Sequence, residues 1–257
     1  MKKQWHIFLT AVMFFTRLPV GKHVPYSEEY LNSSSKHLPI IGWFVGTMSA
    51  LIFYGLSFIL PIHLAILFSM VGSILITGAF HEDGFADVCD GFGGGWTKEK
   101  ILTIMKDSRI GAYGMIGMSI LLLSKFISLS ELQVKIIPFA LIIGHTLSRY
   151  MATLFIFTHD YVREDQTSKS KPLGKKLKTP EFIFATATTL LPFLLFQSVW
   201  VLTIIPAVLL VKFFFARYIN KWIGGYTGDC LGAIQQLTEL SVYVFLTLFQ
   251  VFNLQLL

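Results

Sequence analysis

Six acidic residues crowd into twenty-six positions of this 257-residue chain, between two strongly apolar segments. The stretch that holds them runs from Gly78 to Gly114. Carboxylates this close together repel one another, which costs free energy unless they are protonated, paired with cations or neutralised by a bound metal ion. The crowding therefore predicts a metal site. The six residues are Glu82, Asp83, Asp87, Asp90, Glu99 and Asp107.

Three of these carboxylates have the spacing of one helical face. Asp83, Asp87 and Asp90 stand at positions i, i+4 and i+7, which share a face if a helix continues from the apolar run before them. Their hard oxygen atoms suit Mg²⁺ or Mn²⁺ better than zinc, and Mg²⁺ usually takes one or two carboxylates together with substrate phosphates. The spacing does not fit an EF-hand calcium loop. His81 precedes the three and completes the pattern HxDGxADxxDG.

Glycines and cations flank the acidic residues. Gly84 and Gly91 would let the backbone and a bulky substrate approach each other closely. Downstream, Lys106 and Arg109 surround Asp107 at the entrance to the next apolar run. Cations beside a metal site offset the charge of a diphosphate. The same residues are also typical of the cationic flank of a membrane span, and the two interpretations stay open.

A second glycine-rich segment, GGYTGDCLGA, occupies residues 224–233. Its one carboxylate is Asp229. As a turn before the last apolar run the segment needs no function, yet Asp229 could complete the shell of a metal ion.

Composition places the chain in a membrane. It is 54% hydrophobic and only 14% charged, whereas soluble domains average about 25% charged residues. No linker or repeat divides it, so we expect residues 1–257 to form a single all-α domain, a polytopic membrane helical bundle with catalytic cytoplasmic loops. The net charge of +6 is typical of cationic loops at a membrane, and nucleic acid is not an expected partner.

Hydropathy predicts about seven spans, each close to the ~20 residues that cross a bilayer. The run after Lys178 is the hardest to divide, because Pro192 and Pro206 interrupt it; a kinked helix with a re-entrant piece is the alternative. The predicted spans are residues 38–60, 62–80, 110–129, 134–157, 182–196, 199–215 and 237–256.

The distribution of cations orients these spans. Seventeen of the 21 Lys and Arg residues fall on the side of the N-terminus, which the positive-inside rule makes cytoplasmic. Both ends of residues 5–20 then stay inside, so we expect a re-entrant or interfacial helix there, and an outward C-terminus. The acidic stretch, the basic loop at residues 163–178 and the loop at residues 224–233 would all open onto the cytoplasm.

Five ionisable residues fall within or beside the predicted spans. His145 and Arg149 share a helix face that we expect to point into the bundle, where Arg149 would hold a phosphate or pair with Glu239. For Lys125 and Lys212 we expect snorkelling toward an interface. We place Glu239 near an interface too, because a carboxylate at mid-bilayer costs about 2.5 kcal/mol or more.

Together these motifs resemble those of the cobalamin synthase family, multi-span inner-membrane proteins that are adenosylcobinamide-GDP ribazoletransferases. The stretch at residues 81–91 and MKDSRIGAYG at residues 105–114 carry the resemblance. FFTRLPV at residues 14–20, GGYTGDCLGA, and QLTEL at residues 236–240 resemble the family's terminal elements. The likeness therefore spans nearly the whole chain.

The resemblance implies the last step of cobalamin nucleotide-loop assembly, at the cytoplasmic side of a bacterial inner membrane. A hydroxyl of α-ribazole, or of its 5′-phosphate, would attack the cobinamide-linked phosphorus of adenosylcobinamide-GDP. GMP would leave, and adenosylcobalamin or its 5′-phosphate would form with Mg²⁺ as cofactor. The lower-ligand base, the phosphorylation of the acceptor, the number of metal ions and a homo-oligomeric state stay open.

The expected roles group by chemistry. The catalytic group is His81, Asp83 and Asp87; the metal ligands are Asp83, Asp87, Asp90, Asp107 and Asp229; the substrate-binding group is Lys106, Arg109, Arg149, Gly84 and Gly91. Asp83 and Asp87 would hold Mg²⁺ against the diphosphate. His81 would position a carboxylate or accept the proton of the nucleophile.

Two alternative functions use the same residue types. A CDP-alcohol phosphotransferase also expels a nucleoside monophosphate, with the pattern DGxxARx₈GxxxDxxxD; here Ala86 comes one position early and no Arg follows it. A divalent-cation transporter would need its carboxylates near the membrane midplane, along a pathway. The carboxylates of this chain instead crowd at the expected cytoplasmic end.

Overall fold

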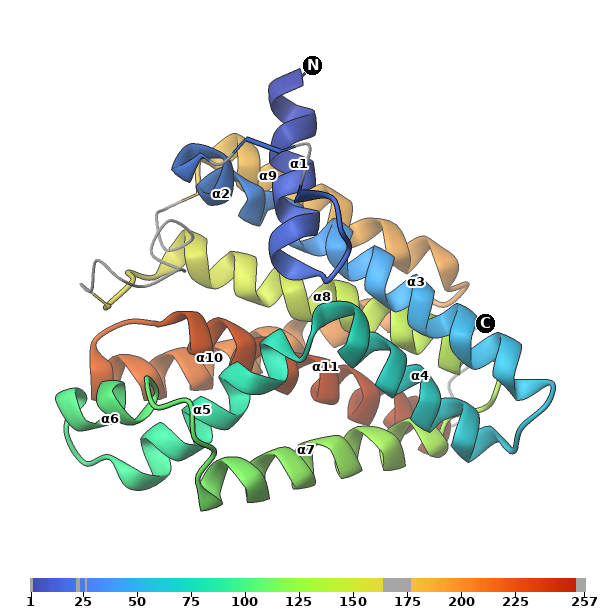
Figure 1. The fold of residues 1–257 in the computed structure, drawn as a ribbon. Helices are drawn as coiled ribbons and strands as arrows, with labels where there is room; N and C mark the ends of the chain where they lie inside the picture. The colour runs from blue at the N-terminus through green and yellow to red at the C-terminus, as the bar shows by residue number, and fades with distance from the viewer. Residues whose placement is uncertain (1, 22–23, 26, 164–176, 253–257) are drawn as a thin grey trace.

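The computed structural model describes residues 2–21, 24–25, 27–163 and 177–252, and in these it is built from helices and turns (Figure 1). One isolated bridge joins Tyr161 to Tyr226. The all-α prediction is therefore confirmed for the described residues. The helices are α1 (Lys2–Phe15), α2 (Glu28–Ser34), η2 (Ser35–His37), α3 (Leu38–Ser57), α4 (Ile62–Thr77), α5 (Phe80–Gly94), α6 (Lys98–Ile104), α7 (Ala112–Ser130), α8 (Ile137–Thr158), α9 (Thr179–Leu190), η4 (Leu191–Leu195), η5 (Val199–Thr203), α10 (Ile204–Ile223) and α11 (Gly228–Val251).

Five helical segments of the described chain are long and apolar enough to cross a membrane. They are residues 28–57, α7, α8, residues 199–223 and α11. A sixth is added if α4 and α5 count as one bent span, whereas residues 179–195 form a shorter apolar helix. The predicted count of seven is thus not confirmed, because two of the predicted spans, 62–80 and 182–196, do not form straight helices of full length.

A sharp bend separates α4 from α5. Gly78 and Ala79 both have left-handed backbone angles, with φ of 68° and 57°, and the two helices meet at 90°. The expectation that one helix continues from the apolar segment into the acidic residues is therefore wrong. The acidic residues lie on a separate helix, which we place outside the membrane spans because four of its fifteen residues are acidic.

The N-terminal segment is anchored at this bend. The backbone N–H of Arg17 donates to the carbonyl of Ile76 at 2.8 Å. The guanidinium of Arg17 covers Gly78 so closely that a Cβ there would lie 2.1 Å from its Nε. Figure 1 shows α1 crossing α3 and α8 at a steep angle. The interfacial placement of α1 stays a prediction.

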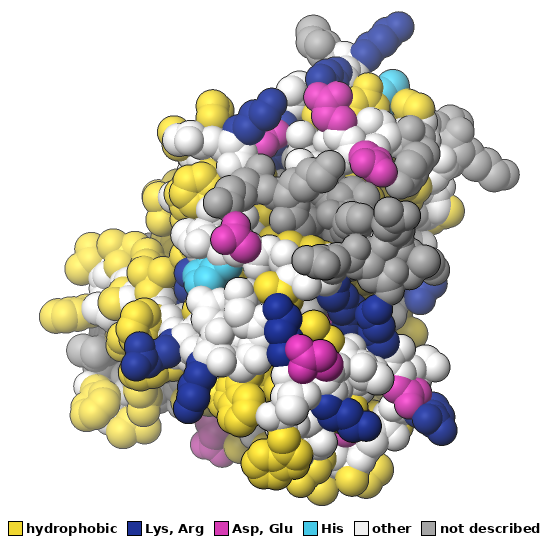
Figure 2. Space-filling view, turned by 90° about the vertical axis from the view of Figure 1, so that its left-hand side faces the viewer, with side chains coloured by type: hydrophobic (Ala, Val, Ile, Leu, Met, Phe, Trp, Pro, Cys, Tyr) yellow, Lys and Arg dark blue, Asp and Glu magenta, His cyan; other side chains and the backbone are white. Residues whose placement is uncertain are grey.

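Helix α8 forms the centre of the bundle, packed between α3 and α11 (Figure 1). Glycines bring α3 and α8 together: a Cβ at Gly42 would lie 2.4 Å from the carbonyl oxygen of His145, and one at Gly46 would lie 2.7 Å from the Cα of Ile142. The turn between α10 and α11 lies beside α6 at one end of the bundle, at the left of Figure 1. Figure 2 faces that end and shows side chains of both signs there, with hydrophobic ones at its margin.

The last helix begins earlier than predicted. α11 starts at Gly228 instead of residue 237, and the hydroxyl of Thr227 caps it by accepting from the N–H of Cys230 at 3.4 Å. Half of the predicted glycine-rich loop is therefore helical. The extra turns also place Glu239 in the middle of the helix, where its residue is 5% exposed and not partly hydrated as expected.

Candidate functional site

Two glycines allow α5 and α11 to pack against each other at close range. A Cβ added at Gly84 would lie 3.0 Å from the carbonyl oxygen of Asp229, and one added at Gly232 would lie 2.9 Å from that of His81. Neither position tolerates a larger residue without moving the helices apart. The contact places the first turn of α11 beside the acidic face of α5.

This contact gathers three carboxylates, those of Asp83, Asp87 and Asp229. Partial burial, and then the charges of Asp229 and Asp83, raise the pKa of Asp87 from 3.8 to about 7. Arg163 acts in the opposite direction. Three carboxylates from two helices thus form one electrostatically coupled cluster, as the sequence predicted for Asp83 and Asp87 and allowed for Asp229.

Arg163 is the cation of this cluster. Its Nη2 donates to Oδ2 of Asp229 at 2.7 Å, and the side chains are 11% and 19% exposed. The hydroxyl of Thr227 donates to the same oxygen at 3.3 Å. Neither residue was among the predicted site residues, although Arg163 begins the predicted basic loop. Of that loop, residues 164–176 lie outside the described residues.

Asp90 has a different position from the other two aspartates of its predicted face. Its two oxygens accept backbone N–H groups of Gly111 and Gly114 at 2.7 and 2.8 Å, at the start of α7. A Cβ at either glycine would lie within 2.4 Å of this carboxylate. Asp90 thus caps α7, and the spacing of the two glycines is explained by the cap.

The predicted residues between α6 and α7 lie on the surface. Arg109 forms a bidentate pair with Asp107, with Nη2 and Oδ2 at 2.7 Å, and forms no ion pair with the carboxylates of α5. Hydrogen bonds from Arg109 lower the pKa of Asp107 to about 2. Lys106 is exposed as well. Gly91, the second predicted substrate contact, packs against Met105, where a Cβ would lie 2.7 Å from Cγ.

His81 faces the interior of the bundle. Its residue is 4% exposed, and its Nε2 has no hydrogen-bond partner within the described part of the chain. The charged groups that act on it are those of Arg149, Glu239, His145 and Lys125. The structure therefore places His81 among buried charges and not among the carboxylates of Asp83 and its neighbours.

Those buried charges form a network between α7, α8 and α11. Glu239 lies at its centre, with Oε1 2.9 Å from Nζ of Lys125 and Oε2 3.3 Å from Nδ1 of His145. Nη1 of Arg149 lies 3.1 Å from the same Nδ1. Arg149 and His145 thus point into the bundle, as predicted. The predicted snorkelling of Lys125 is wrong, because the carboxylate holds its ammonium in the interior, where the residue is 3% exposed.

The network reaches α5 through one amide. Gln236 accepts from Lys125 and donates from Nε2 to Oε1 of Glu82 at 2.9 Å. Glu82 therefore joins the acidic helix to the buried charges. Its direct neighbour in the sequence, Asp83, is exposed.

The carboxylate cluster has the chemistry of a magnesium site. Within the described residues no three His, Cys, Asp or Glu side chains form a ready-made group of metal ligands. Mg²⁺ does not require one, since it is commonly held by one or two carboxylates with water and substrate phosphate completing its shell. Burial first, and then the neighbouring charges of Asp229 and Asp83, raise the pKa of Asp87, and a bound cation would favour its charged form. Asp83, Asp87 and Asp229 therefore fit such an ion.

This chain is similar to the members of one protein family over nearly its whole length. The family profile described as cobalamin-5-phosphate synthase matches residues 7–247. Proteins named adenosylcobinamide-GDP ribazoletransferase are similar over nearly their whole length: one from Leptospira interrogans is 47% identical over 96% of this chain and 97% of its own, and one from Shewanella amazonensis is 45% identical over 96% of both. A third, from Vibrio parahaemolyticus, is 44% identical over 97% of this chain and 94% of its own. No solved structure matches.

Proposed function

Because this chain belongs to the cobalamin-5-phosphate synthase family, we propose that it works as an adenosylcobinamide-GDP ribazoletransferase. It joins α-ribazole or its 5′-phosphate to adenosylcobinamide-GDP and releases GMP. One observation supports this location of the reaction. Asp83, Asp87 and Asp229 lie near one another where α5 packs against α11.

The transfer makes one bond and breaks one bond. A hydroxyl oxygen of α-ribazole attacks the phosphorus linked to cobinamide, and the bridging oxygen of the diphosphate leaves with GMP. Asp83 and Asp87 would hold Mg²⁺, which supplies charge neutralisation for the diphosphate and the leaving group. Asp229, which Arg163 holds at the edge of the cluster, accepts the hydroxyl proton.

Arg163 also has the right chemistry to hold a phosphate oxygen, because a guanidinium binds phosphate and carboxylate in the same way. When the diphosphate enters, it would share Arg163 with Asp229 and free the carboxylate to act as a base. His81 takes no part in this step, because its imidazole is buried among the charges around Glu239.

The protein would act from a bacterial inner membrane, with the cluster on the cytoplasmic side. Bacterial relatives and several long apolar helices support the membrane location. The cytoplasmic side is favoured by the charged residues that gather at the end of the bundle holding α6 and the turn between α10 and α11 (Figure 2). A nucleotide-bearing substrate reaches that side from the cell interior.

The experiment is an assay of the purified full-length protein in lipid nanodiscs. Adenosylcobinamide-GDP and α-ribazole 5′-phosphate are supplied with Mg²⁺ or with EDTA, and GMP and the corrinoid product are quantified by chromatography. We expect equal amounts of GMP and joined product, formed only with Mg²⁺. GMP without joined product would indicate a hydrolase. Product formation in EDTA would show that the reaction does not need Mg²⁺.

A further inference from the structure

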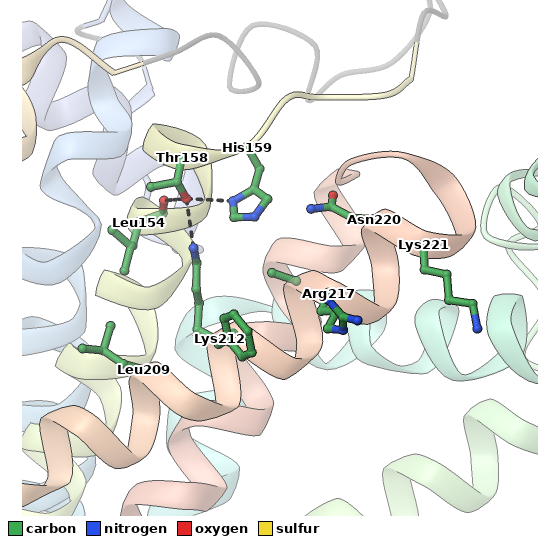
Figure 3. A pocket seen from close by; sticks show the side chains of 10 residues that line it. Leu154, Thr158, His159, Leu209, Lys212, Arg217, Asn220 and Lys221 are labelled. Carbon is green, nitrogen blue, oxygen red and sulfur yellow. Dashed lines mark hydrogen bonds between the residues drawn. The ribbon is translucent and has the colours of Figure 1, made fainter.

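A groove of about 840 Å³ lies between the C-terminal half of α8 and α10 (Figure 3). One end of it is lined by apolar side chains, including Leu154, Leu209 and Phe213. The other end is lined by polar and cationic side chains from the last turns of α10 and from residues 158–159. None of the carboxylates of the proposed catalytic cluster lines this groove.

The polar end carries positive charge that no acidic side chain of the described residues balances. Lys212, Arg217 and Lys221 line the groove from α10, and none of them forms an ion pair with any residue that the structure describes. Nζ of Lys212 donates to the hydroxyl of Thr158 at 3.0 Å and lies 5.0 Å from the centre of the Phe155 ring. Lys212 is thus held inside the groove, whereas Arg217 and Lys221 have no carboxylate partner among the described residues, and an anion would balance their charge.

The apolar end continues the outer face of the span. Leu209 and Phe213 are 39% and 57% exposed, and their neighbours Leu210 and Phe214 are also exposed, on a segment long enough to cross a membrane. Side chains of this kind on a spanning helix contact lipid chains. Along α10 the groove therefore passes from a wall open to lipid to a cluster of cations at the end of the helix.

We propose that the groove binds one anionic phospholipid. Its headgroup phosphate lies at Arg217 and Lys221, and an acyl chain lies along Leu209 and Phe213. Basic pockets between spanning helices recognise anionic headgroups in this way. A small water-soluble anion satisfies the cations but leaves the apolar wall uncovered. This proposal does not depend on the reaction that the protein catalyses.

Native mass spectrometry of the full-length protein tests the proposal. The protein is released from mixed micelles that contain equal amounts of phosphatidylglycerol and phosphatidylcholine, and the retained lipids are counted. The test variant is Arg217→Gln with Lys221→Gln. The matched control is Lys98→Gln with Lys100→Gln, which removes two exposed cations from α6 at the same end of the molecule.

We expect the wild type and the control to retain one phosphatidylglycerol in preference to phosphatidylcholine. Each cation near a headgroup is worth about 1 kcal/mol, so the test variant should bind the anionic lipid about 30-fold more weakly. Circular dichroism checks that both variants fold. Equal retention of the two lipids, equal losses in the two variants, or displacement of the lipid by millimolar inorganic phosphate would overturn the assignment.

Discussion

The buried network around Glu239 gives the sharpest prediction about stability. Glu239 is 5% exposed and contacts Lys125, His145 and Tyr243, the last through a hydroxyl 3.2 Å from Oε1. The change Glu239→Gln keeps the shape of the side chain and removes its charge. Lys125 then keeps the amide oxygens of Gln236 and of the new side chain as acceptors, but has no carboxylate partner within the described residues.

The expected cost follows from the distance and the burial. Two unit charges 2.9 Å apart attract by about 6 kcal/mol at an effective dielectric constant of about 20. Desolvation of both groups offsets part of this attraction, and removing one partner of a buried pair typically costs about 3–5 kcal/mol. We therefore expect Glu239→Gln to lower the free energy of unfolding by about 3–5 kcal/mol.

The assay is chemical unfolding in mixed micelles, followed by circular dichroism, for a double-mutant cycle. Lys125→Met alone also leaves a buried charge without its partner. The double variant Lys125→Met with Glu239→Gln removes both charges, and we expect its loss to be about 1–3 kcal/mol smaller than the sum of the single losses. Additive losses, or a Glu239→Gln protein within about 1 kcal/mol of the wild type, would refute the ion pair.

Three further predictions concern the acidic helix. The pKa of Asp87 is raised to about 7 in the folded protein, so the folded state binds more protons than the unfolded state between about pH 4 and 7. In EDTA the melting temperature should therefore fall as pH rises through this window, and Asp87→Asn should flatten this dependence of melting temperature on pH. Asp90→Ala removes the cap of α7 and should cost about 0.5–2 kcal/mol in chemical unfolding, whereas an unchanged midpoint would contradict the cap. Gly84→Val should force α5 away from Asp229, and normal GMP release by that variant would show that the contact is not needed.

The proximity of Asp83 and Asp87 is easier to predict from the sequence than the path of the chain. Helical spacing and charge repulsion lead to Asp83 and Asp87, because these effects depend on residues close together in the sequence. The same spacing includes Asp90, which the structure assigns to the cap of α7. Asp90 differs from the others because Gly111 and Gly114 donate to it. This is a tertiary contact, and the spacing of residues along one helix cannot predict it.

The bend and the buried pair were missed for a related reason. A left-handed Gly78 is common at the end of a helix, but a left-handed Ala79 has no signal in the sequence, since its conformation depends on the packing around the bend. Lys125 was predicted to snorkel because its partner is 114 positions away in the sequence. A buried lysine is stable only beside such a partner, which becomes evident only when α7 and α11 are placed side by side.

The most direct test of the carboxylate cluster is Mg²⁺-dependent GMP release by Asp83→Asn, measured in nanodiscs. Asp83 is exposed, so its substitution should leave the fold intact. Glu99→Gln is the matched control, because it neutralises an exposed carboxylate on α6 that lies outside the cluster. We predict that Asp83→Asn lowers the rate at least about 100-fold while the control stays near the wild type. A folded Asp83→Asn protein with near-normal GMP release would contradict the proposed metal site.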